Sequence, residues 1–203
     1  MKATAILFFL VTGLLGWGCG TTETPAEHLY VLHLPGQDRA GGLDPAGPWF
    51  RLEQLQVQDF ARGRTIWARV SPIEVEAWRR HRWALPIGDL AEAAVHAWAR
   101  SCGRFAGVGR PREEAGRCTF HRFTIENFEE VDEGDRWYAY VAVELGARLE
   151  QGGKIRRWRG RLTARVPARA RHPRELVLAF GRALEEVLEK GWARLAAAPE
   201  EEG

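Results

Sequence analysis

The stretch AYVAVELGARLEQGGKIRRWRGRLTARV, residues 139–166, decides the fold of this chain. Gly152 and Gly153 near its centre form the Gly-Gly pair that favours a two-residue type I′ turn, and hence a β-hairpin. With the turn placed there, the register is determined, and it pairs Leu149 with Arg156, Ala147 with Trp158, Val143 with Leu162, Val141 with Ala164 and Ala139 with Val166. One face of the hairpin is then almost entirely apolar, which predicts that it is buried.

The opposite face of the hairpin carries charge. The same register sets Glu144 opposite Arg161 and Tyr140 opposite Arg165, which predicts a charge pair and a cation–π contact. A basic stripe runs along this face and consists of Arg157, Arg159, Arg161 and Arg165. Two interpretations stay open for it: contact with anionic lipid headgroups or an acidic partner, and an ordinary solvated strand face. The second is favoured because one-sided polar faces are common in antiparallel sheets.

Strands are predicted on the N-terminal side of the hairpin as well. Alternation and β-branched content indicate strands at residues 29–34, 51–60, 65–70 and 119–128. Residues 35–48 are rich in Gly and Pro, which predicts a loop.

Two helices are predicted. Residues 89–100 have Asp89 as N-cap with Glu92 as its capping-box partner, and Gly103 as the stop signal. Pro173 suits the first position of a closing helix, whose apolar residues recur at spacings of three and four: Leu176, Val177, Phe180, Leu184, Val187, Leu188 and Leu195.

This element order predicts a single layered α/β domain over residues 29–198, with a mixed, largely antiparallel sheet packed by two main helices. Residues 199–203, PEEEG, are expected to form a solvated acidic tail.

The first residues have the pattern of an export signal. Lys2 precedes an apolar run over residues 5–15, which is too short to span a bilayer, and small residues lead up to Cys19. Residues 1–18 are therefore interpreted as a signal peptide, Cys19 as a lipidated cysteine and residues 19–28 as a flexible tether. Gly16 occupies the position where lipoprotein signals usually have Leu, so cleavage by the ordinary signal peptidase is the alternative.

Cysteine arithmetic favours lipidation. The chain has three cysteines, and an exported protein with an odd number leaves one thiol unpaired. Acylation of Cys19 would leave Cys102 and Cys118 as a disulfide candidate, since export leads to an oxidising compartment. A metal site joining these two cysteines to His121 and His96 is the weaker alternative, because the spacing is not that of a tight metal motif.

Composition and motifs narrow the function classes. Hydrophobic residues make up 45% of the chain and charged residues 28%, as in a globular protein, and the net charge of +2 does not indicate nucleic acid as a partner. No hydrolase elbow, zinc-protease motif, phosphate loop or dinucleotide-binding motif is present in the sequence. The paired carboxylates Glu129 and Glu130 are expected to be solvated. The sequence thus favours a protein without enzymatic activity, cofactor or metal.

Residues 71–86, SPIEVEAWRRHRWALP, carry a family resemblance. This stretch resembles the signature of the ABC-type transport auxiliary lipoproteins, the PqiC-like family. The residues that carry the resemblance are Ser71, Pro72, Trp78, His81, Arg82, Trp83 and Pro86. The likeness extends over most of the mature chain. Physically, Pro72 is expected to interrupt a strand that ends near Val70, and the two tryptophans to pin a crossing from strand to helix. Because Trp and Arg are typical interface residues, the signature is also a candidate contact surface for another subunit.

The resemblance implies a fold similar to the N-terminal domain of the TolB type. It also implies a periplasm-facing docking subunit of a lipid transport system, whose partners would be a substrate-binding protein of the mammalian-cell-entry type and an ABC permease and ATPase. N-terminal acyl chains would hold the chain at a membrane, and Gly20 after the cysteine favours the outer membrane. The alternative is a carrier that shields an acyl chain in an internal apolar pocket of several hundred cubic ångströms. Whether the chain forms a homo-oligomer is left open.

Overall fold

The computed structural model describes residues 26–38, 41–110 and 116–202. The predicted signal peptide, Cys19 and most of the tether lie outside these residues. The strands are β1 (His28–Tyr30), β2 (Trp49–Leu52), β3 (Leu55–Val57), β4 (Thr65–Ser71), β5 (Glu74–Trp83), β6 (Gly107–Val108), β7 (Arg117–Asp132), β8 (Trp137–Gln151), β9 (Lys154–Pro167) and β10 (Glu200–Glu202). The α-helices are α2 (Ile87–Ser101) and α3 (Pro173–Ala196), and short 3₁₀ turns are η1 (Pro35–Asp38) and η2 (Asp59–Ala61).

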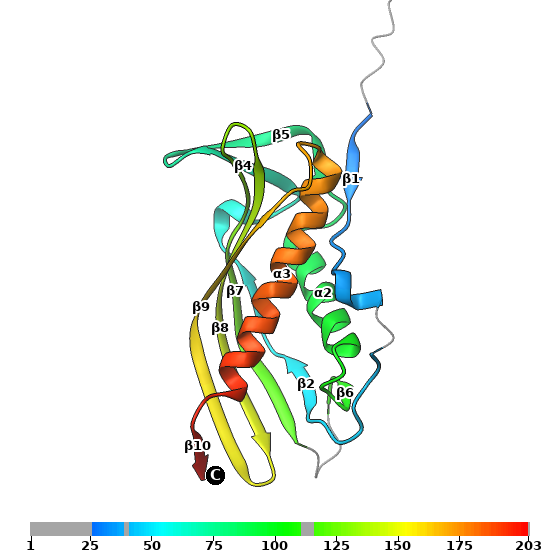
Figure 1. Cartoon of the computed structure of the whole chain (residues 1–203), viewed down its shortest axis with the longest axis vertical. Helices are drawn as coiled ribbons and strands as arrows, with labels where there is room; N and C mark the ends of the chain where they lie inside the picture. The colour runs from blue at the N-terminus through cyan, green and yellow to red at the C-terminus, as the bar shows by residue number, and fades with distance from the viewer. Residues whose placement is uncertain (1–25, 39–40, 111–115, 203) are drawn as a thin grey trace, which may run out of the picture.

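The strands form one mixed ten-stranded sheet, whose main path is β1-β5-β4-β7-β8-β9-β10 (Figure 1). The long strands β7, β8 and β9 are antiparallel neighbours, whereas β2, β3 and β4 all pair in parallel with β7. The predicted fold class, a single α/β domain with a mixed sheet and two helices, is confirmed.

The β8–β9 hairpin has the predicted register at every one of the five pairs named from the sequence. Gly152 and Gly153 have φ angles of 60° and 76°, the left-handed values that a type I′ turn requires. Val141 and Val143 are fully buried on the apolar face, so the hairpin contributes one wall of the core.

The single strand predicted over residues 51–60 is wrong in extent. β2 and β3 follow one another along the same edge of β7, and the chain then turns through η2 before β4 continues along that edge. Three short strands thus share one long partner. The alternation of apolar and polar residues is interrupted because the chain leaves β7 between β2, β3 and β4.

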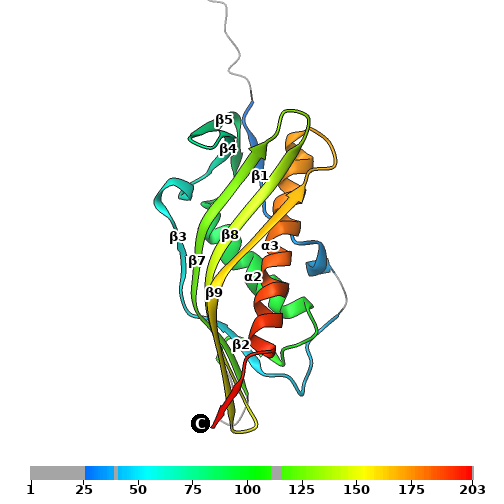
Figure 2. The same cartoon turned by 60° about the vertical axis from the view of Figure 1, so that its left-hand side comes forward.

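Both helices lie on one side of the sheet (Figures 1 and 2). In α3, Pro173 occupies the first turn and the His172 side chain accepts a hydrogen bond from the Arg174 N–H, and all seven apolar residues predicted to form its stripe are buried. α2 begins two residues earlier than predicted. Pro86 is its N-cap and Asp89 lies within the first turn, so the predicted capping box is not formed. Its end at Cys102 and Gly103, which has a φ angle of 69°, agrees with the predicted stop.

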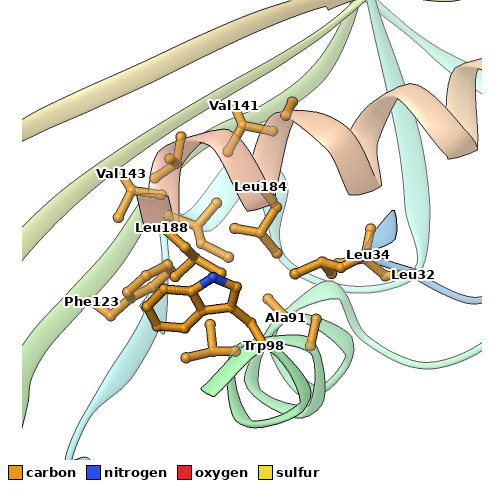
Figure 3. Packing of buried hydrophobic residues seen from close by; sticks show 14 of the residues in the cluster. Leu32, Leu34, Ala91, Trp98, Phe123, Val141, Val143, Leu184 and Leu188 are labelled. Atoms are coloured by element: carbon orange, nitrogen blue, oxygen red, sulfur yellow. The ribbon is translucent and has the colours of Figure 1, made fainter. Parts of the chain in front are cut away.

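The core lies between this sheet face and the helices (Figure 3). Trp98 from α2, Phe123 from β7 and Leu188 from α3 meet there, each at most 2% exposed. The segment that carries the buried Leu32 and Leu34 crosses α3 closely. A Cβ on Gly181 would lie 1.8 Å from the His33 carbonyl oxygen, so the crossing requires glycine there.

The predicted solvated acidic tail forms a short strand that was not predicted, and its Glu200 and Glu201 are exposed as expected. β10 pairs with the first residues of β9, and the Glu200 carboxylate contacts Lys154 and Arg156. Its acidic side chains match the basic start of β9, which explains why the segment pairs with the sheet.

Candidate functional site

The signature residues lie on a hairpin that the sequence interpretation did not predict. β4 and β5 are antiparallel and joined at Pro72 and Ile73, and the Ser71 Oγ accepts a hydrogen bond from the Ile73 N–H at 3.4 Å. Pro72 was expected to interrupt a strand before a helix. It occupies a β-turn instead, where its φ angle suits the second turn position, and the chain then returns as a strand of ten residues.

The two signature tryptophans anchor this hairpin differently. Trp83 is 1% exposed and packs against Phe128 and Phe180, with ring centroids 5.8 and 5.6 Å away. Trp78 is half-buried, and its Nε1 donates to Glu130 Oε2 at 2.6 Å. The expectation that tryptophans hold this segment to the core is therefore met at the base of the hairpin.

Glu129 and Glu130, which were expected to be solvated, are 1% and 2% exposed. Glu129 accepts two hydrogen bonds from Arg69 on β4, at 2.8 and 2.9 Å. Burial raises the pKa of Glu130 to about 7, although the hydrogen bond from Trp78 opposes this shift. Both carboxylates lie in β7 and bind the β4–β5 hairpin to the sheet, which is why the protein can bury them.

β1 joins the same region. His81 Nδ1 lies 2.8 Å from the Tyr30 hydroxyl, and the His81 ring stacks on His28 with centroids 4.9 Å apart. Burial lowers the pKa of His81, and the neighbouring His28 adds to that effect. Arg82 forms an ion pair with Glu27. Through these contacts the chain that enters from the N-terminal side is held at the base of the β4–β5 hairpin.

The basic stripe is matched by carboxylates. Each of its four arginines forms an ion pair: Arg157 with Glu201, Arg159 with Glu144, Arg161 with Glu126 and Arg165 with Glu133. A stripe compensated in this way has no excess positive charge for lipid headgroups, so the solvated-face interpretation is favoured.

Two of the predicted side-chain contacts across this hairpin are wrong in detail. Glu144 bonds Arg159 rather than Arg161, and the Arg165 guanidinium lies 3.9 Å from the ring centroid of Tyr138 rather than over Tyr140. In both cases the arginine reaches the residue two positions before its register partner on β8. Long side chains select diagonal neighbours in a twisted sheet, although the backbone register is as predicted.

The predicted disulfide is not formed, because Cys102 and Cys118 are both free thiols. Cys102 caps the end of α2, where its Sγ lies 3.7 Å from the Ala99 carbonyl oxygen, whereas Cys118 is fully buried in β7. Burial raises the pKa of both thiols. Both thiols are therefore protonated at neutral pH.

Several hollows open at the surface of the described part of the chain. Four of them have volumes of about 240 to 590 Å³, and the lining of each contains charged side chains. Among the described residues, no group of three or more His, Cys, Asp or Glu side chains could hold a metal ion. Within the same residues, no helix has the length and apolar character needed to span a membrane.

Comparison with solved structures finds the same fold elsewhere. A crystal structure of a Xanthomonas campestris protein of family DUF330 matches with a TM-score of 0.61 and 18% identity, over 82% of this chain and 94% of that chain. A second crystal structure, of an uncharacterized protein, matches with a TM-score of 0.59 and 14% identity, over 85% of this chain and 99% of that chain. At these identities the likeness is one of fold.

Comparison of sequences gives a narrower result. No family model matches the chain. The hydrogenase maturation factor HypA of Azotobacter vinelandii is 31% identical over 90 residues, which span 39% of this chain and 80% of that protein. This similarity covers about two fifths of the present chain, whereas the structural matches cover more than four fifths of it.

The sequence interpretation missed the β4–β5 hairpin and the burial of Glu130. A signal for the hairpin was available, because Ser71-Pro72-Ile73-Glu74 is a turn sequence between two β-rich stretches. For Glu130 there was none, since its partner Trp78 lies 52 residues earlier in the chain.

Proposed function

We propose that this chain is a lipid-anchored docking subunit of a lipid transport system in the bacterial cell envelope. Cys19 would hold it by acyl chains at the outer membrane, facing the periplasm. Its partners would be a substrate-binding protein of the mammalian-cell-entry type and an ABC permease with its ATPase. The export pattern before Cys19 and the signature at residues 71–86 support this proposal.

The packed interior is the observation that favours docking over the alternative, an acyl-chain carrier. A carrier needs an apolar cavity between its sheet and helices. In this domain that space holds Trp83, Trp98, Phe123 and Phe180, which are at most 2% exposed, and the hollows described above have charged side chains in their linings. This filled interior supports a docking role over that of a lipid carrier.

Purification of the protein from its native membrane tests this choice. We expect phospholipid below one molecule per chain after detergent exchange, measured by mass spectrometry of the extract. One tightly held phospholipid per chain would favour the carrier.

The anchor is tested by labelling with a clickable fatty acid in cells that express the wild type or Cys19→Ser. We expect label in the wild type alone. Equal labelling of both proteins, or of neither, would contradict the anchor.

The docking role is tested by disrupting the gene in the native bacterium and complementing it with each of these two proteins. Periplasmic crosslinking should recover a shuttle protein with the wild type, and envelope lipid transport should return with the wild type but not with Cys19→Ser.

A further inference from the structure

The β4–β5 hairpin ends at Ile73, which is the most exposed large hydrophobic residue of the described chain. Ile73 is 97% exposed, and Val70 and Val75 on either side of the turn are each 38% exposed. We define these three residues with Pro72 as the aliphatic tip. Isolated exposed apolar residues are ordinary, but four at the end of a projecting hairpin expose apolar surface that the fold itself does not use.

The hairpin is held firmly at its base and projects from the body. Trp83 is buried and Trp78 bonds Glu130. Arg69 bonds Glu129 and also donates from Nη1 to the Pro72 carbonyl oxygen at 3.3 Å, so it ties the tip itself to β7. Figure 1 shows the β4–β5 hairpin at the end of the molecule where β1 enters, and β4 pairs with β7 as far as Arg69, so only the turn end of the hairpin extends beyond that pairing. A hairpin with a fixed base and an apolar end is suited to insertion into a less polar environment than water.

The entry point of the chain indicates which phase this is. β1 pairs with the last residues of β5, so Glu27 and the residues before it start at the base of this hairpin. Residues 20–27, which connect Cys19 to that base, span at most about 28 Å when extended. The ten residues of β5 span about 30 Å from base to tip. Cys19 and the tip can therefore lie at about the same distance from the base of the hairpin.

We propose that the aliphatic tip inserts into the surface of the membrane that holds the Cys19 anchor, as a second membrane contact. This inference rests on the proposed function, because it takes Cys19 as the anchor. The tip suits lipid better than a protein partner. The four side chains that define the tip are aliphatic, and residues 70–75 contain none of the aromatic residues and arginines that dominate protein interfaces.

Charge contributes little to this contact. Glu74 lies within the tip segment, between Ile73 and Val75, and the exposed charged residues that follow on β5 are Glu76, Arg79 and Arg80, so the formal charges of these four residues sum to zero. The contact should therefore depend weakly on anionic lipid. A second contact also has a physical purpose, since one anchor leaves a domain free to rotate while two fix its orientation for docking.

The test uses the full acylated protein in vesicles that contain no other protein. The Ile73→Cys variant is compared with Leu43→Cys, a control that is 48% exposed beside the end of α2, away from the hairpin. A charged, water-soluble maleimide reports whether each thiol is in water. Wild-type protein supplies the background, which is low because Cys118 is buried and burial raises the pKa of Cys102.

Two states are compared: acylated protein bound to phosphatidylcholine vesicles, and detergent-free protein released by proteolysis of the tether. We expect the Ile73→Cys thiol to label about tenfold more slowly in the vesicle-bound state, because the aliphatic tip then leaves water. The Leu43→Cys thiol should label at the same rate in both states. Vesicles with added phosphatidylglycerol should give the same result. Unchanged labelling of Ile73→Cys on acylated, vesicle-bound protein would overturn the inference. So would protection that appears only at high protein density, since this would identify a second copy as the occupant.

Failure of this inference is distinguishable from failure of the proposed function. If Cys19 is not acylated, the wild type takes up no fatty acid and does not bind vesicles at all. If the anchor is right and the tip contact is wrong, the protein binds vesicles and the Ile73→Cys thiol stays reactive.

Discussion

The two hairpins of this molecule use their residues in opposite ways. The β8–β9 hairpin buries an apolar face under α3 and matches the arginines of its other face with carboxylates. The β4–β5 hairpin is bound at its base by Trp83 and by two buried carboxylates, and it leaves an aliphatic tip exposed. In the β8–β9 hairpin, the apolar face is buried and the arginines are paired within the fold. The other leaves apolar surface uncovered, and this difference separates a structural element from a candidate contact element.

The largest expected effect comes from a matched pair of substitutions, one in each hairpin. Val143→Asp places a charge at a fully buried position of β8 and should cost at least about 4 kcal/mol of unfolding free energy, because nothing there can pair with it. Val75→Asp, within the exposed aliphatic tip, should change stability by less than about 0.5 kcal/mol. Urea unfolding followed by tryptophan fluorescence measures both. Similar losses in the two variants would contradict the distinction.

The base of the β4–β5 hairpin should respond to pH through Glu130. The folded-state pKa is about 7 against an unfolded value of 4.5, so the folded state favours the protonated carboxyl. Its stabilising effect is present below about pH 4.5 and is lost as the pH rises through about 7. Glu130→Gln keeps an acceptor for Trp78 and removes this loss, so it should stabilise the protein by about 3 kcal/mol at about pH 8, and much less at about pH 4.

Unfolding free energies at the two pH values check this prediction. Glu129→Gln is the matched control, because it weakens the doubly bonded contact with Arg69 and should destabilise the protein at both pH values. A gain for Glu130→Gln that is the same at both pH values would exclude a titrating Glu130.

The turns of the two hairpins should differ in their tolerance of side chains. Gly153 has a positive φ angle, so Gly153→Ala should cost about 1 kcal/mol. Among the described residues, positive φ angles occur at glycines alone, so Ile73 needs no special backbone conformation. Ile73→Ala should leave stability unchanged within about 0.5 kcal/mol. Thermal unfolding curves would reveal a reversal of this order.

The smallest expected effect concerns the basic stripe. Arg161→Ala removes an exposed ion pair with Glu126 and should cost about 0.5 kcal/mol at low salt, and less at high salt because ions screen the pair. Arg80→Ala, on the exposed edge of β5, should have no salt-dependent effect on stability. A loss for Arg161→Ala that is insensitive to salt would mean that packing, rather than charge, holds this side chain.

Predictions from the sequence were correct where the interacting residues are close in the chain, and wrong where they are far apart. The β8–β9 register and the buried stripe of α3 were predicted correctly, because a Gly-Gly turn and a helical periodicity are signals contained in neighbouring residues. Burial of Glu129 and Glu130 was missed, because it depends on Arg69 and Trp78 from distant strands. The cysteines were predicted to pair on the basis of number and compartment, neither of which positions the two sulfurs.

The sequence by itself determined the strands and helices that local signals specify: the β8–β9 pairing, the closing helix and the α/β class with its mixed sheet. The tertiary structure alone decided which arginine meets which carboxylate, that three short strands share the edge of β7, and that the tip of the β4–β5 hairpin stays exposed. The physical reason is that turn chemistry and periodicity act over a few residues. Burial, diagonal pairing in a twisted sheet and the absence of a cover over the tip arise when distant segments pack together.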